Sequence, residues 1–193
     1  MAPVAITLTP YGGLAGLLLV EGKSFPDDRG FFMEAFRADD WAKAGLPPLV
    51  QDNLSRSRKG VVRGLHYQKP PQAIGKLVRC ARGRVFDVAV DIRRGSPTFG
   101  RWVGAELSAD NARQMLVPKG FAHAYCTLTE ECEVLYKCTD YYAPPCEGAL
   151  RWSDPSIGID WIVPADAIST NARDDSAALL ADFDSPFVYG QIG

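Results

Sequence analysis

Residues 84–92 read RVFDVAVDI, and this short stretch decides the fold class. Every second residue from Phe86 to Ile92 is apolar, and Asp87 and Asp91 fall on the opposite face of the alternation. A period of two residues is typical of a β-strand with one face buried more deeply than the other. We therefore expect a half-buried strand here, ended by the turn residues Gly, Ser and Pro that follow it.

Comparable stretches occupy the middle of the chain, separated by glycine, proline or charged turns. We expect further strands at residues 61–68, 76–82, 101–107, 113–118, 122–128 and 131–138. Many short strands at this spacing are typical of a β-sandwich, jelly roll or barrel. Two short helices are expected beside them, one at 39–44 with Asp39 as its N-cap and a weaker one from Asp174 to Leu180.

Length and composition limit the function classes. The chain has 193 residues without a linker-like tract, which predicts one domain over residues 1–193. Its 21 basic and 23 acidic residues give a net charge of −2, so no overall basic field favours nucleic acid or an anionic membrane. The apolar run at 14–20 is too short and too rich in glycine for a membrane span or signal peptide.

The chain has five cysteines, an odd number without a C-x-x-C pair: Cys80, Cys126, Cys132, Cys138 and Cys146. This pattern predicts buried thiols in a reducing compartment better than a disulfide framework or a zinc site. We therefore expect a cytoplasmic protein.

His66, one of only two histidines, lies in the strand that begins near Val61. Regular alternation would place Gly64 and His66 on the same side as Val62, opposite Arg63. A lone histidine in a strand is more often structural than functional. However, Lys76 and the second histidine, His123, also lie near strand ends beside glycine, where a jelly roll opens into its cavity.

For two other side chains, the sequence alone does not decide between a role in the site and an ordinary structural role. Lys76 precedes apolar Val78 and Cys80 on one face of its strand, so its ammonium either lies at the mouth of a cavity or is an ordinary solvated strand end. Tyr136 shares its face with Val134 and points inward, as a core tyrosine also would.

A metal would be an alternative use for histidines in a β-barrel. Metal-dependent cupins need a His-x-His pair with a carboxylate and a further histidine, whereas His66 and His123 are isolated in sequence. We therefore expect no metal.

Five separated motifs occur in order between about residues 5 and 185: DDRGFFMEAF (27–36), QDNLSRSRKGVVRGLHYQ (51–68), GKLVRCARGRVFDVAVDIRRGSPTFGRW (75–102), VPKGFAHAY (117–125) and LYKCTDYYAP (135–144). Together they closely resemble the dTDP-4-dehydrorhamnose 3,5-epimerase family. The resemblance implies an all-β, cupin-like double-stranded β-helix (jelly roll) with short flanking helices. It also implies an isomerase that needs no cofactor and acts on a dTDP-sugar.

The resemblance also implies roles for individual residues. His66, in the R-G-L-H motif, matches the general base, and its aspartate partner falls in TNARDDSAALL (170–180), where Asp174 is the match and Asp175 the neighbouring alternative. Lys76 matches the lysine beside the substrate's keto oxygen, and Tyr136 matches the proton donor.

Further positions match residues that hold the nucleotide diphosphate and sugar, including a tyrosine that stacks on thymine at position 142. They are Arg29, Glu34, Gln51, Asn53, Arg63, His123, Tyr142, Glu147 and Arg173. The family forms homodimers through exchanged N-terminal strands, which suggests that role for the stretch before Arg29.

Epimerising a carbon next to a ketone requires a base, a stabiliser for the enolate oxygen and an acid on the opposite face. The resemblance therefore predicts conversion of dTDP-4-dehydro-6-deoxy-D-glucose to dTDP-4-dehydro-L-rhamnose by proton exchange at C3 and C5. The alternatives are a single-position epimerase acting at C3 or C5, a non-catalytic sugar-nucleotide-binding cupin, and a metal-dependent cupin.

Overall fold

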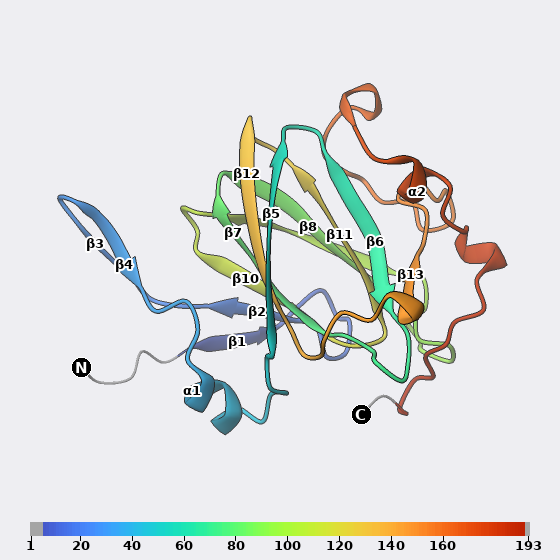
Figure 1. Cartoon of the computed structure of the whole chain (residues 1–193), viewed down its shortest axis with the longest axis horizontal. Coiled ribbons are helices and arrows are strands. Elements are labelled where there is room, and N and C mark those ends of the chain that lie inside the picture. Colours follow the sequence, from blue (N-terminus) through green and yellow to red (C-terminus); the bar gives the residue numbers. More distant parts are fainter. Residues whose placement is uncertain (1–5, 192–193) are drawn as a thin grey trace.

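A computed structural model describes residues 6–191, and these are built mainly of antiparallel strands in two large sheets (Figure 1). The first sheet has six strands. In spatial order these are β1 (Thr7–Pro10), β2 (Leu18–Glu21), β10 (Arg113–Val117), β7 (Lys76–Arg82), β12 (Glu131–Cys138) and β5 (Gln51–Arg58).

The second sheet has five strands, and a separate hairpin stands outside both sheets. The strands are β13 (Glu147–Ala149), β6 (Val62–Gln68), β11 (Phe121–Thr127), β8 (Arg84–Asp91) and β9 (Trp102–Ser108), and the hairpin is β3 (Ser24–Asp27) with β4 (Gly30–Met33). Two antiparallel sheets facing each other form a jelly roll. The all-β, jelly-roll fold class is confirmed.

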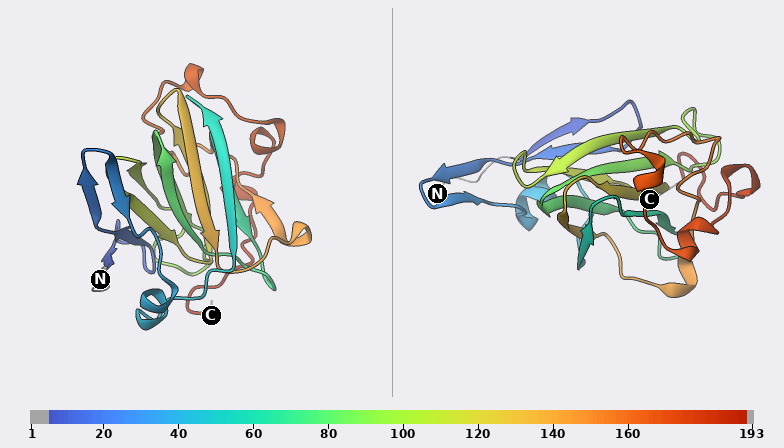
Figure 2. Two further views of the ribbon diagram at one scale, coloured as in Figure 1. Left: turned by 60° about the vertical axis from the view of Figure 1, so that its left-hand side comes forward. Right: turned by 90° about the horizontal axis from the view of Figure 1, so that it is seen from above.

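Apolar side chains fill the space between the sheets and also cover both outer faces. Val78 and Val134 of the first sheet meet Val85 and Leu107 of the second in the central core. The C-terminal segment, residues 150–187, covers the outer face of the five-stranded sheet with its own apolar residues. Figure 2 shows this segment, coloured orange to red, on the side of the molecule away from the β3–β4 hairpin.

The helices differ from the predicted ones in where they begin. Helix α1 spans Ala38–Lys43 with Arg37 as its N-cap, so the prediction of Asp39 at that position is wrong. Asp39 lies instead in the first turn, where a carboxylate interacts favourably with the helix dipole. Beside it, Trp41 is buried against the outer face of the six-stranded sheet.

The predicted start of the second helix, at Asp174, is also wrong. Helix α2 spans Ala172–Asp175, because the Asn171 side chain accepts a hydrogen bond from the Asp174 amide at 2.8 Å and caps the helix earlier. Three 3-10 turns complete the structure: η1 (Pro144–Cys146), η2 (Ala165–Ala167) and η3 (Leu180–Asp182).

The alternation of β8 is confirmed, but the prediction that the strand is only half buried is wrong. Asp87 and Asp91 are both fully buried, because the other sheet covers the face that they occupy and the C-terminal segment covers the apolar face. The sequence pattern indicates which residues share a face, whereas what covers that face depends on distant parts of the chain.

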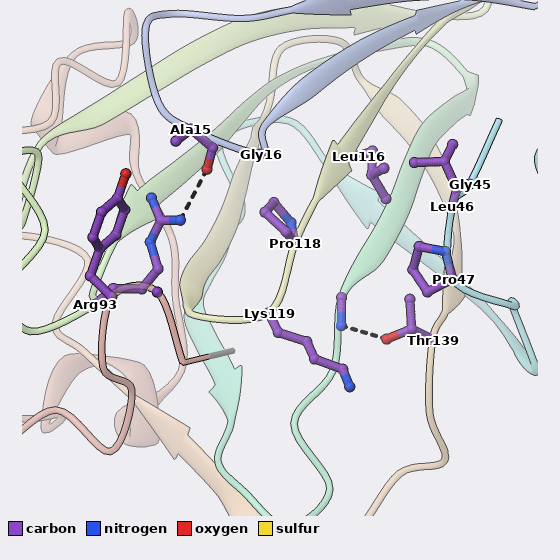
Figure 3. Close-up of a pocket in the computed structure, with 13 residues that line it drawn as sticks. Ala15, Gly16, Gly45, Leu46, Pro47, Arg93, Leu116, Pro118, Lys119 and Thr139 are labelled. Atoms are coloured by element: carbon purple, nitrogen blue, oxygen red, sulfur yellow. Dashed lines mark hydrogen bonds between the residues drawn. The ribbon is translucent and has the colours of Figure 1, made fainter. Parts of the chain in front are cut away.

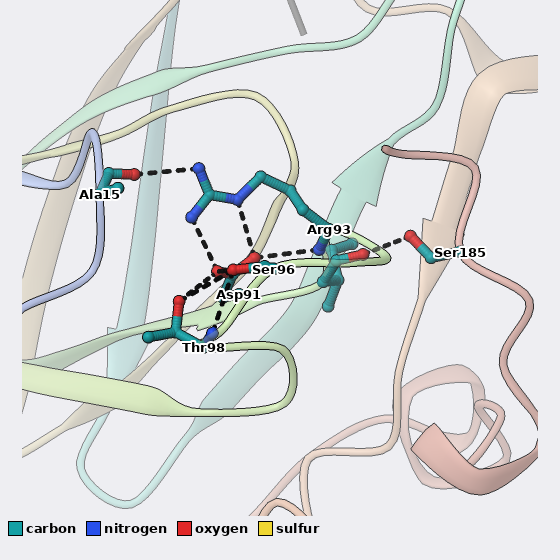
Figure 4. Close-up of polar contacts among 7 residues, drawn as sticks. Ala15, Asp91, Arg93, Ser96, Thr98 and Ser185 are labelled. Carbon is teal, nitrogen blue, oxygen red and sulfur yellow. Dashed lines mark hydrogen bonds and ion pairs between the residues drawn. The ribbon is translucent and has the colours of Figure 1, made fainter. Parts of the chain in front are cut away.

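Asp91 is the centre of a buried polar network (Figure 4). It accepts two hydrogen bonds from the Arg93 guanidinium, at 2.7 and 2.8 Å, and one each from the hydroxyls of Ser96 and Thr98, both at 2.6 Å. Arg93 also donates to the Ala15 carbonyl at 3.0 Å. The network thus connects the end of β8 to the loop between β1 and β2.

Replacing Asp91 by asparagine is expected to destabilise the fold strongly. The change leaves the Arg93 cation buried without its counter-charge, which costs about 3–5 kcal/mol when one partner of a buried ion pair is lost. Urea unfolding at neutral pH measures the loss. Asp184→Asn removes the exposed partner of Arg94 and is the matched control, for which no measurable change is expected.

The effect of Asp91→Asn is also expected to depend on pH. Burial alone would raise the pKa of Asp91, but hydrogen bonds from Arg93, Ser96 and Thr98 lower it below its ordinary value. A lowered pKa stabilises the folded state above the unfolded-state value of about 3.9, and this contribution disappears as the pH falls through the folded-state value. Wild type and variant should therefore converge in stability on acidification, and a constant difference down to acid unfolding would contradict this assignment.

All five cysteines lie within the described residues, and each is buried and unpaired, as predicted. Among residues 6–191, no helix has the length and apolar character needed to cross a membrane.

Candidate active site

His66 and Asp174 form a directly bonded pair. His66 Nε2 lies 2.7 Å from Asp174 Oδ1, although the two residues are 108 positions apart in the sequence. Asp174 is fully buried, and its second oxygen accepts the Gly64 amide at 3.1 Å. Burial would raise the pKa of Asp174, but the hydrogen bond and charge of His66 and the Gly64 amide lower it. The carboxylate is therefore ionised and fixes the imidazole from one side.

The neighbouring carboxylate, Asp175, points elsewhere. Its Oδ1 accepts a hydrogen bond from the Trp152 indole at 2.8 Å. Of the two alternatives left open by the sequence, Asp174 is therefore the residue that contacts His66.

The predicted alternation along β6 is wrong at Gly64. Tyr125 of β11 lies opposite Arg63, and His123 lies opposite His66, with an irregularity in the pairing between them. Tyr125 and His123 are two positions apart and share a face, so Arg63 and His66 share it as well. The extra residue is a bulge that turns both side chains toward the space between the sheets.

Glycine is required at this bulge. Gly64 has a φ of +125°, and a Cβ there would lie 2.5 Å from the Ala124 Cβ and 2.5 Å from the His123 carbonyl oxygen. The R-G-L-H motif therefore needs its glycine in order to bring His66 to the inner face.

A cavity of about 340 Å³ lies between the sheets at this point. Its lining comes from both sheets and from the loops that precede β7 and follow β12: Gln51, Asn53, His66, Tyr67, Gln68, Ile74, Lys76, Tyr136, Cys138, Tyr142 and Glu147. His66 belongs to the five-stranded sheet, whereas Lys76 and Tyr136 belong to the six-stranded sheet. The predicted base and the predicted proton donor therefore lie on opposite walls of one cavity.

Lys76 and Tyr136 are partly buried neighbours. Lys76 Nζ lies 5.7 Å from the centre of the Tyr136 ring. Burial raises the pKa of Tyr136, so its phenol is protonated at neutral pH. Burial lowers the pKa of Lys76, while the nearby charges of Asp87 and Glu147 act in the opposite direction.

Several predicted binding residues meet at the mouth of the cavity. The Tyr142 hydroxyl donates to Glu147 at 2.9 Å, and Arg173 forms an ion pair with the same carboxylate at 3.0 Å. Gln51 accepts the Tyr142 amide at 2.9 Å and donates to Asn53 at 3.1 Å. The structure therefore places these five positions in one connected group beside His66.

Two other predicted binding residues, His123 and Arg63, are not part of the cavity lining. His123 lies opposite His66 on β11 and is buried, and its Nε2 lies 2.8 Å from Asp87 Oδ1. Arg63 is exposed and donates from Nε to the Ser57 hydroxyl at 3.0 Å. The sequence prediction does not include Asp87 among the site residues, because the alternation of this strand suggested that Asp87 lies on its less buried face. The sequence signal that could have indicated a buried carboxylate is an aspartate within the apolar stretch FDVAV (86–90).

Arg29 and Glu34, also predicted binding residues, are absent from the cavity lining as well. Arg29 lies at the tip of the β3–β4 hairpin, which projects from the body of the molecule, and its exposed side chain pairs with Asp27 at 2.6 Å (Figure 1). Glu34, just after this hairpin, pairs with Arg37.

A larger cavity, of about 760 Å³, opens at another place (Figure 3). Leu46, Pro118 and Tyr189 line it with other apolar groups, together with Arg93 and Lys119. Its lining contains none of the predicted catalytic residues. Size alone therefore does not identify the candidate active site.

Within residues 6–191, no group of three or more histidine, cysteine, aspartate or glutamate side chains is arranged to hold a metal ion.

Residues 12–182 match the family model described as dTDP-4-dehydrorhamnose 3,5-epimerase. The chain belongs to this family. The dTDP-4-dehydrorhamnose 3,5-epimerase of Salmonella typhimurium is 51% identical over 168 residues, covering 86% of this chain and 91% of the relative.

Two further relatives are informative, the first for its bound ligand and the second for its named activity. The dTDP-6-deoxy-D-glucose-3,5-epimerase of Legionella pneumophila, solved in complex with dTDP-4-keto-L-rhamnose, superimposes with a TM-score of 0.89 at 45% identity, covering 95% of this chain and 97% of that one. The dTDP-4-dehydrorhamnose 3-epimerase of Streptomyces niveus is 38% identical, covering 88% of this chain and 82% of the relative.

Proposed function

We propose that this chain is an isomerase that converts dTDP-4-dehydro-6-deoxy-D-glucose to dTDP-4-dehydro-L-rhamnose by epimerising C3 and C5. One observation carries the proposal: in a member of this epimerase family, His66 faces Lys76 and Tyr136 across a single cavity. Inverting a carbon next to a ketone requires a base and an acid on opposite sides of the ring, and the two walls of the cavity supply them.

His66 acts as the base in this mechanism. Its Nε2–H donates to Asp174, which leaves the lone pair of Nδ1 free to accept the proton from carbon. The ionised Asp174 stabilises the imidazolium that forms. Because the carboxylate is itself held by the Gly64 amide, the imidazole keeps one orientation through the reaction.

Lys76 stabilises the intermediate. Once the proton has left C3 or C5, the negative charge moves to the keto oxygen at C4, and an ammonium beside that oxygen lowers the energy of the enolate. The interaction is stronger with the enolate than with the neutral ketone, and for that reason it accelerates the reaction.

Tyr136 returns a proton to the opposite face. Its phenol is protonated at neutral pH because burial raises its pKa. The resulting tyrosinate would lie close to the Lys76 ammonium, whose charge stabilises it until solvent restores the proton. The His66 imidazolium releases its own proton to solvent before it acts as a base again. The cycle is redox-neutral, and we propose that it needs neither a metal nor a cofactor.

We assign the dTDP group to this cavity and to the residues around its mouth. Arg63 carries a permanent positive charge suited to phosphate oxygens, and Tyr142 presents an exposed ring on which thymine can stack. The other contacts are assigned to Gln51, Asn53, His123, Glu147 and Arg173.

Arg29 and Glu34 suggest that the complete site needs a second copy of the chain. The β3–β4 hairpin carries Arg29 together with three exposed aromatic residues, Phe25, Phe31 and Phe32. Exposed apolar side chains on a projecting hairpin are typical of an interface. We propose a homodimer in which this N-terminal hairpin is exchanged and delivers Arg29 to the partner's cavity.

Two further assignments remain proposals. The whole chain, residues 1–193, forms one domain, because both large sheets contribute to the same central core. The protein is cytoplasmic, because its five buried cysteines remain unpaired thiols.

Deuterium incorporation tests the reaction directly. The protein is incubated with dTDP-4-dehydro-6-deoxy-D-glucose in deuterated water, and NMR reads label and configuration at each carbon. Label and inversion at both C3 and C5 support the proposal. Label confined to one carbon would instead assign a single-position epimerase, the activity named for the Streptomyces niveus relative. Binding without any exchange would assign a non-catalytic protein.

Asp174→Asn is expected to reduce kcat by on the order of 10², because the neutral amide no longer stabilises the imidazolium or fixes one tautomer of His66. Asp175→Asn is the matched control. Its side chain contacts Trp152 instead of His66, and an amide oxygen can still accept that bond, so kcat should change little. Steady-state kinetics of the two variants decide the assignment, and a reversed order of effects would contradict it.

A further inference from the structure

Asp87 is a buried carboxylate that is only partly satisfied. Its Oδ1 bonds to His123, whereas its Oδ2 is buried and has no hydrogen-bond partner among the described residues. A buried carboxylate with an unpaired oxygen is unfavourable unless a nearby positive charge compensates for it. The identity of that charge determines what Asp87 does.

His123 does not supply the charge. It is itself deeply buried, and burial lowers its pKa even though Asp87 acts in the opposite direction. A neutral imidazole can donate its Nε2–H to Asp87 but leaves the negative charge uncompensated. The bond therefore orients His123 without neutralising the carboxylate.

Lys76 is the cation that faces the same space between the sheets as Asp87. It shares the inner face of β7 with Val78 and Cys80, which pack in one core cluster with Val85 and Ala89, the residues on either side of Asp87 on the inner face of β8.

Among the described residues Lys76 has no ion pair within contact distance, and the charges of Asp87 and Glu147 both favour its ammonium against the effect of burial. Glu147 is already paired with Arg173 and bonded to the Tyr142 hydroxyl. Its charge is therefore shared with groups at the cavity mouth.

The remaining titratable groups around Lys76 do not provide a negative charge at neutral pH. Cys138 lies opposite Lys76 on the neighbouring strand, and burial raises the pKa of its thiol. Tyr136, on the same strand, also has a raised pKa. His66 and His123 face the site from β6 and β11, and neither of them can carry a negative charge in water.

We propose that Asp87 is a positioning residue that acts as the buried counter-ion of Lys76, keeping the lysine protonated in the empty cavity so that it is ready to meet the enolate. The role rests on the proposed function of Lys76. Without Asp87, burial would favour the neutral amine, and the site would lose its stabilising charge. The same carboxylate fixes the orientation of the His123 ring through its bond to Nε2.

Asp87→Asn tests the proposal, because asparagine keeps the size of the side chain and the bond to His123 but removes the charge. The lysine should then deprotonate at a lower pH. We expect kcat close to wild type near pH 6 and a loss that grows with pH to about tenfold once the pH is above the transition of Lys76 in the wild type, as follows from a shift of about one unit. Glu106→Gln, which removes an exposed carboxylate paired with Arg84, is the control and should leave the profile unchanged.

A merely structural role would reduce kcat by the same factor at every pH, and that result would overturn the proposal. NMR of isotope-labelled lysine provides a second readout that does not depend on turnover. The Lys76 signal, assigned by its loss in Lys76→Met, should titrate at lower pH in Asp87→Asn than in the wild type. An unchanged titration would also overturn the proposal. The dTDP affinity and melting temperature of Asp87→Asn identify a variant that has failed to fold. In that case the wild-type protein decides, because the proposal requires Lys76 to be protonated near pH 7 before substrate binds, and a neutral amine there would overturn it.

The same variants separate this inference from the proposed function. Full turnover by Lys76→Met would show that the lysine does not stabilise the enolate, and the proposed mechanism would fail. Loss of turnover in Lys76→Met together with a pH profile of Asp87→Asn that matches the wild type would leave the mechanism standing and refute only the role of Asp87.

Discussion

His66→Ala is expected to reduce kcat by on the order of 10² to 10⁴, the usual contribution of a general base. The imidazole is the only group in the proposed mechanism that accepts the proton from carbon, and alanine cannot replace it. Affinity for dTDP should stay within a few fold, because the nucleotide contacts are assigned to other residues. Steady-state kinetics and calorimetric titration with dTDP measure the two quantities separately.

Arg63→Ala gives the opposite pattern and serves as the comparison. It removes a cation assigned to phosphate, so dTDP affinity should fall while a measurable kcat remains at saturating substrate. Turnover of His66→Ala within about tenfold of the wild type would end the assignment of His66 as the base.

Tyr136→Phe is expected to separate proton removal from inversion. The variant keeps His66, Asp174 and Lys76, so the enolate still forms, but the donor on the opposite wall is missing. In deuterated water, the imidazolium exchanges its proton with solvent and returns deuterium to the face that it came from. Label should therefore enter C5, and more slowly C3, while inversion falls behind by on the order of 10² or more.

NMR of substrate and product distinguishes exchange with retention from exchange with inversion. Tyr141→Phe is the matched control, since this exposed tyrosine lies next to Tyr142 but outside the cavity lining. Its exchange and inversion rates should both equal those of the wild type. Inversion by Tyr136→Phe at the wild-type rate would mean that another acid serves that face.

The sequence predicts the all-β class because alternation is a local property. In β8 it correctly indicates which side chains share a face, yet it misplaces Asp87 and Asp91 in a half-solvated environment. Their burial is produced by the facing sheet and by residues 150–187, both distant in the chain. Period alone therefore cannot reveal how deeply a strand is covered.

The site shows a related limit. The family resemblance indicates His66, Lys76 and Tyr136, and the structure places them around one cavity. Regular alternation fails at Gly64, because one extra residue in a bulge reverses which face every later side chain occupies. Arg29 matches a binding position in sequence, but its hairpin holds it away from the cavity of its own chain.

The C-terminal segment that carries Asp174 also has a consequence for how activity responds to heat. It is attached to the five-stranded sheet by apolar side chains such as Leu150 and Phe187 and by isolated backbone hydrogen bonds, such as that from Val62 to Ser169. Because isolated hydrogen bonds protect a segment less than a full strand ladder does, we expect it to open locally at a lower free energy than the global unfolding of the paired sheets. Each opening withdraws Asp174 from His66 and exposes the Gly64 amide to hydrogen exchange with solvent. Turnover should therefore cease at a temperature below that at which the two sheets separate.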